Sequence, residues 1–211
     1  MKLEGLSINF LGDSITMGER TSAPEKVFHQ LIKEKYGLSH AYNYGVGGTR
    51  IARQVVPTED RPRFDVTFEL RAEIMNRKTD AIVVFGGTND FGHGDAPFGT
   101  IDSEDIYTFC GAVNSLINKL QKDFPTAKII FLTPIHRITE NEPSFPDSKI
   151  LKDYVDAILE ICKKRDIPVI DLFKINPLDA HDTDLLPDGL HPNDKGHSIL
   201  ADVIGEELLK I

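Results

Sequence analysis

The chain has 211 residues, of which 40% are hydrophobic and 27% are charged; this composition excludes a disordered tail. Its formal net charge of −9, with no concentrated basic face, argues against nucleic acid or an anionic membrane as a partner. No apolar run approaches the roughly 20 residues that a membrane-spanning helix requires, and the length leads us to expect a single domain, residues 1–211.

Apolar runs of strand length alternate with stretches in which apolar residues recur every three or four positions. The first pattern is typical of buried parallel strands and the second of helices that bury one face. In chain order, we expect a strand at Leu6–Leu11, a helix at Val27–Ile32, strands at Ala41–Tyr44 and Ala81–Phe85, a helix at Ile106–Leu120, a strand at Ile129–Thr133, a helix at Leu151–Cys162, a strand at Val169–Leu172 and a helix at Ile199–Leu208. Loops are expected at Pro57–Arg63, Phe91–Ser103 and Arg137–Asp147.

Strands that alternate with helices form right-handed crossover units with helices on both faces of a parallel sheet. The sequence therefore predicts an α/β fold, a three-layer α/β/α sandwich with a five-stranded parallel sheet in flavodoxin-like order. In such sheets, ligands bind beyond the carboxyl ends of the strands. The motifs described next all fall at that edge.

Two cysteines, Cys110 and Cys162, lie on the apolar faces of predicted helices. We expect both to be buried free thiols, which suits a reducing compartment. Glu4 interrupts the apolar segment near the N-terminus, so no secretory signal is apparent. These features predict a cytoplasmic protein.

The first motif, Gly12-Asp13-Ser14, directly follows the first predicted strand. Gly12 allows a sharp turn, after which a serine can expose its hydroxyl and offer its own N–H to a developing oxyanion. A serine in this position is also a common helix N-cap, so Ser14 is either a nucleophile or a cap. We expect Asp13 to hold the turn by accepting bonds from backbone N–H groups.

Two more motifs follow the second and third strands. Residues 43–48, Asn-Tyr-Gly-Val-Gly-Gly, have three glycines in four positions, which indicates either an N–H donor at Gly48 or an ordinary turn. In Gly87-Thr88-Asn89-Asp90, the neutral amide of Asn89 is able to donate to an oxyanion without acting as a base, although asparagine is also common in turns. Asp90 is expected to bond to local loop backbone.

The last motif is Asp188-Gly189-Leu190-His191-Pro192. Two intervening residues place a carboxylate beside an imidazole around one tight turn, and Pro192 is expected to start the final helix. Asp194 and His197 repeat the same spacing, but they lie within the predicted helix, and we interpret them as structural.

In this order, the motifs resemble the conserved blocks of the SGNH, or GDSL-type, esterase and lipase superfamily, and they span residues 12–192. The resemblance implies the SGNH hydrolase fold, with Ser14 as nucleophile, His191 as base and Asp188 as the group that orients the base. It implies an oxyanion hole formed by the N–H groups of Ser14 and Gly48 and the side chain of Asn89. The expected activity is ester hydrolysis through an acyl-enzyme, without cofactor or metal.

The substrate is expected to be a small-molecule ester, with acetyl groups on a polar or carbohydrate substrate favoured over long acyl chains. The chain has no tryptophan, and its edge loops carry polar residues, namely His93, Asp95, His136, Arg137 and Glu140. A lipase or lysophospholipase activity is the alternative within the family. Phe91, Phe98 and Ile135 either line a small acyl pocket or pack in the core. Arg50 either reaches the site or caps a helix, and we favour the cap.

Two other classes of function remain open. A stretch of carboxylates and imidazoles would suit a metal-dependent hydrolase; it contains Asp179, His181, Asp182, Asp184, Asp188, His191 and Asp194. The other alternative is a non-catalytic carbohydrate-binding module with the same fold. Retention of every motif argues against it.

Overall fold

Five parallel strands form one sheet in the order β2-β1-β3-β4-β5. The structure, a computed structural model, describes residues 1–211. The strands are β1 (Ser7–Gly12), β2 (His40–Gly45), β3 (Ala81–Phe85), β4 (Lys128–Leu132) and β5 (Val169–Ile170). The helices are α1 (Ser14–Met17), α2 (Phe28–Tyr36), α3 (Phe68–Ala72), α4 (Thr88–His93), α5 (Phe109–Asp123), α6 (Leu151–Lys164), α7 (Leu172–Ile175) and α8 (Asp194–Lys210), with 3₁₀ helices η1 (Pro24–Lys26) and η2 (Pro62–Asp65).

The predicted fold class is confirmed, because the chain is an α/β/α sandwich with an all-parallel sheet in flavodoxin-like order. Each predicted strand and long helix is present, with ends displaced by a few residues. Strand β5 is shorter than predicted because the Asp171 carboxylate accepts a bond from the N–H of Lys174, and Leu172 already begins α7.

Two other boundaries differ from the prediction. The last helix begins at Asp194 with Asn193 as its cap, so Pro192 precedes the helix instead of occupying its first position. Residues 91–93, predicted as loop, belong to α4. Short helices such as α1, α3, α4 and α7 were not predicted, because four to six residues are too few to show a helical period.

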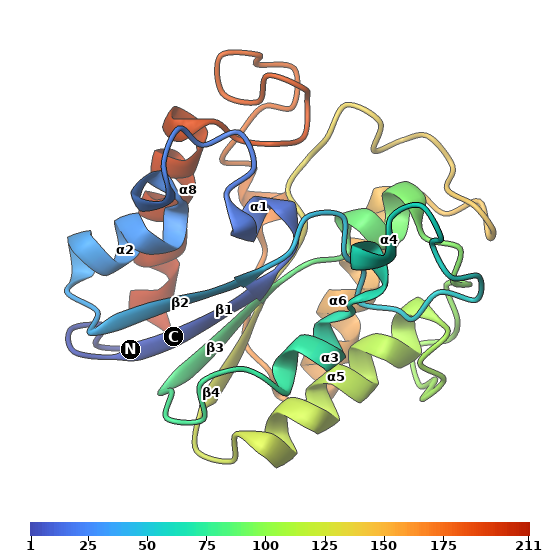
Figure 1. The fold of residues 1–211 in the computed structure, drawn as a ribbon, viewed down its shortest axis with the longest axis horizontal. Coiled ribbons are helices and arrows are strands. Elements are labelled where there is room, and N and C mark those ends of the chain that lie inside the picture. Colours follow the sequence, from blue (N-terminus) through green and yellow to red (C-terminus); the bar gives the residue numbers. More distant parts are fainter.

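Alternate strand residues build two apolar cores on opposite faces of the sheet. In β3, Ile82 and Val84 belong to the core under α3, α5 and α6, whereas Ala81, Val83 and Phe85 belong to the core under α2 and α8. Figure 1 shows α2 and α8 on one side of the sheet and α3, α5 and α6 on the other. Burial on both faces accounts for the nearly continuous apolar runs of the strands.

The two cysteines are buried and unpaired, as predicted. Burial raises the pKa of the Cys110 thiol to about 11 and that of the Cys162 thiol to about 12. None of the helices combines the length and the apolar content needed to cross a bilayer. The cytoplasmic location stays a prediction.

Arg71 of helix α3 is a buried cation at the carboxyl ends of β1 and β2. Its guanidinium donates to the carbonyl oxygens of Gly12 and Tyr44, and to the Thr49 hydroxyl at 2.8 Å. It also lies 4.5 Å from the ring centroid of Phe68. Burial lowers the pKa of Arg71 to about 10, so the group remains charged at neutral pH. One side chain therefore ties together the ends of two strands and the loop that follows β2.

We expect Arg71→Met to lower the free energy of unfolding by at least about 2 kcal/mol. The Tyr44 carbonyl oxygen and the Thr49 hydroxyl lose this donor, while the Gly12 carbonyl oxygen keeps the N–H of Val46. Each group left unsatisfied costs about 1–3 kcal/mol. Urea unfolding measures the change. Arg77→Met is the matched control, because Arg77 is half-exposed and its ion pair with Asp123 is of the surface type, worth less than about 1 kcal/mol. Equal losses in the two variants would contradict the special role of Arg71.

Candidate active site

Ser14 lies at the sharp turn between β1 and α1. Gly12 ends the strand, where a Cβ would lie 2.9 Å from the carbonyl oxygen of Phe85. Asp13, not Ser14, is the N-cap of α1, and its Oδ1 accepts the N–H of Ile15 at 3.0 Å, as expected. The cap interpretation of Ser14 is therefore wrong, and its hydroxyl is available for another partner.

Asp13 is fully enclosed, and burial raises the pKa of its carboxyl to about 6. The N–H of Ile15 and the charge of Arg71 act in the opposite direction and favour the carboxylate. The group is engaged with the turn, which agrees with the structural role predicted for it.

The hydroxyl of Ser14 meets the imidazole of His191, although 177 positions separate the two residues. The distance from Ser14 Oγ to His191 Nε2 is 2.9 Å. On the other side of the ring, His191 Nδ1 lies 2.9 Å from Asp188 Oδ2. The structure thus brings the three residues together as a hydrogen-bonded series, hydroxyl to imidazole to carboxylate.

Asp188 is held by its own turn. Its Oδ1 accepts the N–H groups of Leu190 at 3.2 Å and His191 at 2.8 Å. Although partial burial raises the pKa of Asp188, the N–H and imidazole of His191 and the N–H of Leu190 outweigh it and lower the value to about 2. Asp188 is therefore a carboxylate at neutral pH. Arg20, which the sequence did not indicate, lies with its Nε 3.2 Å from the same Oδ2.

Gly48 and Ser14 line the same cavity, and the backbone N–H of each lacks a backbone acceptor. Ser14 is the first residue of α1, so no carbonyl oxygen of a preceding helical turn accepts its N–H. The N–H of Gly48 bonds to no backbone or side-chain acceptor. Gly48 has φ +78°, and a Cβ on it would lie 2.0 Å from Phe64 Cε1. Both the backbone angle and the contact with Phe64 therefore require glycine.

The buried side chain of Asn89 extends from the first turn of α4. Its Nδ2 donates to the carbonyl oxygen of Thr49 at 3.0 Å, and its Oδ1 lies 3.2 Å from His93 Nε2. An amide nitrogen carries two hydrogens. The bond to Thr49 uses one, which leaves the second free.

Ser14, Gly48, Asn89 and His191 line one cavity of about 260 Å³. Its other lining residues are Glu19, Gly47, Arg63, Phe64, His93, Arg137 and Leu190. Only two of the lining residues are hydrophobic. The cavity is therefore small and polar, and its lining includes the Ser14 hydroxyl and the imidazole to which it is bonded.

The other aspartate and histidine with the same spacing serve the fold. The carboxylate of Asp194 accepts bonds from the N–H and hydroxyl of Ser22. The ring of His197 is buried, and its Nδ1 lies 3.3 Å from the N–H of Phe28. The structural interpretation of this pair is confirmed.

Asp90 does not bond locally as predicted. Its two carboxylate oxygens accept the N–H groups of Ile51 and Ala52 at 3.0 and 2.9 Å, nearly 40 positions earlier in the chain. Burial raises the pKa of Asp90 to about 6, while these N–H groups act to lower it. Asp90 thus attaches the loop after Gly48 to helix α4.

The three apolar residues considered for an acyl pocket pack in the cores instead. Phe91 and Ile135 are buried, and Phe98 packs against the core that contains Phe91. None of them lines the cavity at Ser14. The packing interpretation is correct.

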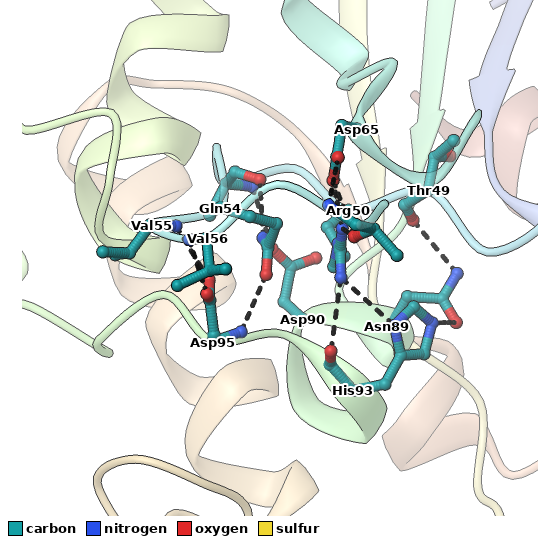
Figure 2. A network of polar contacts seen from close by, with 12 residues as sticks. Thr49, Arg50, Gln54, Val55, Val56, Asp65, Asn89, Asp90, His93 and Asp95 are labelled. Carbon is teal, nitrogen blue, oxygen red and sulfur yellow. Dashed lines mark hydrogen bonds and ion pairs between the residues drawn. The ribbon is translucent and has the colours of Figure 1, made fainter. Parts of the chain in front are cut away.

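Arg50 follows the interpretation that the sequence favoured. Its guanidinium donates to the carbonyl oxygen of His93 at the end of α4 at 3.2 Å, and it forms an ion pair with Asp65 at 2.6 Å. Figure 2 shows Arg50 between Asp65 and His93. Only 4% of its side chain is exposed. Arg50 also lines a neighbouring cavity of about 420 Å³, which shares Phe64 and His93 with the cavity at Ser14.

The carboxylates of the acidic stretch before α8 hold turns. Asp179 accepts the N–H of His181, and Asp182 accepts the N–H of Asp184. No three His, Cys, Asp or Glu side chains lie together in a way that could hold a metal ion. The stretch predicted as a possible ligand set is therefore not gathered into one.

Several residues that line the cavity at Ser14 were not predicted from the sequence. Phe64 and Arg63 lie in η2, and the only signal for them was the predicted edge loop Pro57–Arg63. Glu19 follows α1 closely, so its proximity to Ser14 was a usable signal. Leu190 lies inside the last motif, between Asp188 and His191, and its exposure to the cavity has no sequence signature.

The chain belongs to the GDSL-like lipase/acylhydrolase family, whose sequence profile matches residues 10–199. Membership of this family makes the protein a hydrolase. No curated protein matches the chain.

Solved structures share the fold over nearly the whole chain. A protein from Lactobacillus plantarum is 26% identical, with a TM-score of 0.79, and the match covers 98% of each chain. A lipase/acylhydrolase from Enterococcus faecalis is 23% identical, with a TM-score of 0.66 and coverage of 96% of this chain and 95% of that one. An acetyl xylan esterase is 21% identical, with a TM-score of 0.66 and coverage of 96% and 100%.

Proposed function

We propose that the protein is a serine esterase that hydrolyses carboxylic esters through an acyl-enzyme. The observation that carries the proposal is the hydrogen-bonded series of Ser14, His191 and Asp188, with 2.9 Å at both links. A serine hydroxyl becomes a useful nucleophile when an adjacent base accepts its proton and a third group orients that base. Membership of the acylhydrolase family supports the same reaction.

The reaction proceeds in two steps. His191 accepts the proton of Ser14 as Oγ attacks the ester carbonyl carbon, and the imidazolium returns the proton to the departing alcohol. Water then attacks the acyl-enzyme with the same base and releases the acid. Asp188 keeps Nδ1 of His191 as the protonated nitrogen, so that Nε2 is free to accept.

The oxyanion of each tetrahedral intermediate is stabilised by three donors, namely the N–H groups of Ser14 and Gly48 and the Nδ2 of Asn89. The first two are held by backbone, and the third is held by its bond to Thr49. Donors fixed in advance cost no reorganisation when charge develops. A neutral amide also keeps its donors at every working pH.

We expect wild-type protein to hydrolyse p-nitrophenyl acetate and Ser14→Ala to lose this activity. A fluorophosphonate should add one covalent group to the wild type, which mass spectrometry would locate at Ser14. Ser115→Ala is a matched control, because Ser115 lies on α5 away from the cavity.

Labelling at another residue would overturn the nucleophile assignment. A protein that folds but shows no turnover would favour the non-catalytic module. Activity that disappears in EDTA and returns with a metal ion would favour the metal-dependent alternative.

Asn89→Ala should lower kcat by about 10² to 10³, because removing one oxyanion donor costs about 3–4 kcal/mol in the transition state. KM should change little, since the bond forms fully only in the transition state. Steady-state kinetics with p-nitrophenyl acetate measure both constants. Asn141→Ala, an exposed asparagine outside the cavity, is the control. A kcat near that of the wild type would remove Asn89 from the oxyanion hole.

The proposed substrate is a small acyl group, in particular acetyl, on a polar or carbohydrate molecule. The cavity of about 260 Å³ has only two hydrophobic residues in its lining, whereas long acyl chains require a wide apolar groove. Glu19, Arg63 and Arg137 offer polar groups for the alcohol part of the ester. The shared fold with an acetyl xylan esterase is in keeping with this substrate class.

The value of kcat/KM should fall steeply as the acyl chain of p-nitrophenyl esters is lengthened from C2 to C8. A longer chain has no apolar surface on which to bind in this cavity. Deacetylation of a panel of acetylated sugars, run beside the series, tests the alcohol part of the substrate. Rates that rise toward C8 would instead favour the lipase or lysophospholipase alternative.

A further inference from the structure

The orientation of the Asn89 amide is set by contacts at both of its ends. Its Nδ2 donates to the Thr49 carbonyl oxygen at 3.0 Å, and its Oδ1 lies 3.2 Å from Nε2 of His93, one helical turn later on α4 (Figure 2). Rotation of the amide by 180° would exchange oxygen and nitrogen. Such a rotation would turn the proposed oxyanion donor into an acceptor, so what prevents it matters for the reaction.

Arg50 fixes which nitrogen of His93 carries the proton. Nδ1 of His93 lies 3.4 Å from Nη1 of Arg50, and a guanidinium has donors only. Nδ1 must therefore be the acceptor, and the proton of the neutral ring lies on Nε2. Nε2 faces Asn89, so the amide atom opposite it must accept, which makes that atom Oδ1.

The guanidinium of Arg50 is itself held firmly. Asp65 accepts from its Nη2 at 2.6 Å, Thr58 accepts from the same nitrogen at 3.0 Å, and the carbonyl oxygen of His93 accepts from Nη1 at 3.2 Å. Partial burial and the positive charges of Arg50, Arg137 and Arg61 lower the pKa of His93, so the ring is neutral at physiological pH. The proton arrangement is therefore stable under working conditions.

We propose that His93 is a positioning residue for ester hydrolysis, which donates from Nε2 to Oδ1 of Asn89 and thereby keeps Nδ2 directed as an oxyanion donor. The inference rests on the proposed function of Asn89. In this series Asp65 holds Arg50 in place, Arg50 fixes which ring nitrogen of His93 carries the proton, and His93 fixes the orientation of the Asn89 amide. His93 touches no reacting atom in this scheme.

Two replacements that have the same shape as each other distinguish the positioning role of His93 from a merely structural one. In His93→Gln the side-chain amide is able to donate to Asn89 Oδ1 and to accept from Arg50. In His93→Glu the carboxylate has the same size and still pairs with Arg50, but it has no hydrogen to donate. Because His93 belongs to neither apolar core, neither replacement leaves a cavity in one.

His93→Gln should retain kcat within about tenfold of the wild type. His93→Glu should lower kcat by about 10² or more with little change in KM, approaching the loss of Asn89→Ala. The carboxylate repels Oδ1 and attracts Nδ2, so the amide either turns over or leaves its place, and in both cases the donor is lost. Equal kcat values for the two variants would overturn the proposal.

A double-mutant comparison tests whether His93 acts through Asn89. In the Asn89→Ala background, the Gln and Glu replacements should give the same kcat, because the amide they orient is gone. If His93→Glu still lowers kcat by about 10² in the Asn89→Ala background, its effect comes from the added charge or from altered folding, and the proposal is wrong. His40→Glu controls only for the change in net charge, since His40 is exposed at the start of β2, the opposite end from the cavity.

Failure of the proposed function would be recognised separately. If Ser14→Ala kept its activity, the esterase mechanism would fail whatever the His93 variants did. The orientation of the amide has a readout that needs no turnover, namely the Asn89 side-chain amide signals in ¹⁵N–¹H spectra. Both variants lose the imidazole ring, so the informative comparison is between them. These signals should differ strongly between His93→Gln and His93→Glu; coincident signals in the two variants would contradict the positioning role.

Discussion

The bonds of the Arg71 guanidinium are the constraint on which the geometry of the site depends. Three of its four acceptors, on Gly12, Tyr44 and Thr49, belong to the end of β1, the end of β2 and the loop beyond it; the fourth is the carbonyl oxygen of Val66. At the carboxyl edge, the strand ladder no longer pairs every carbonyl oxygen, and a planar group with several donors satisfies them in a fixed arrangement. The turn that carries Ser14 and the loop that carries Gly48 are therefore spaced by one buried side chain.

A second buried group extends this frame to the helix that carries Asn89. Asp90 accepts the N–H groups of Ile51 and Ala52, which joins the loop after Gly48 to the first turn of α4. Arg71 and Asp90 thus hold the three segments that supply the proposed oxyanion donors. Buried charges are retained only when they are paired or fully hydrogen-bonded, so their presence here reflects the demand for a fixed geometry at this edge.

The sequence was sufficient for the features that have a period or a motif, and insufficient for those that depend on a single buried polar residue. Helix α6 was predictable because 14 residues repeat an amphipathic spacing, and the meeting of Ser14 with His191 followed from the rule that parallel strands end at one edge. Arg71 had no such signal, because an arginine in a five-residue helix looks like a surface residue. His93 also had no such signal, because the sequence indicates only a polar loop residue; its role depends on the partners of its two ring nitrogens, which only the structure gives.

The two sides of the cavity differ in their exposure to water, and this difference suits the proposed reaction. On the side of the proposed oxyanion hole, Ser14 and Asn89 are each 5% exposed, and the proposed donors are neutral. On the base side, the side chains of His191 and Asp188 are 19% and 31% exposed. Neutral donors away from water stabilise a developing oxyanion more strongly than they would in solvent. In the proposed reaction the imidazole becomes charged in each step, and the second step requires a water molecule beside it. Burial would oppose both the charge and the access of water, so partial solvation of His191 favours both.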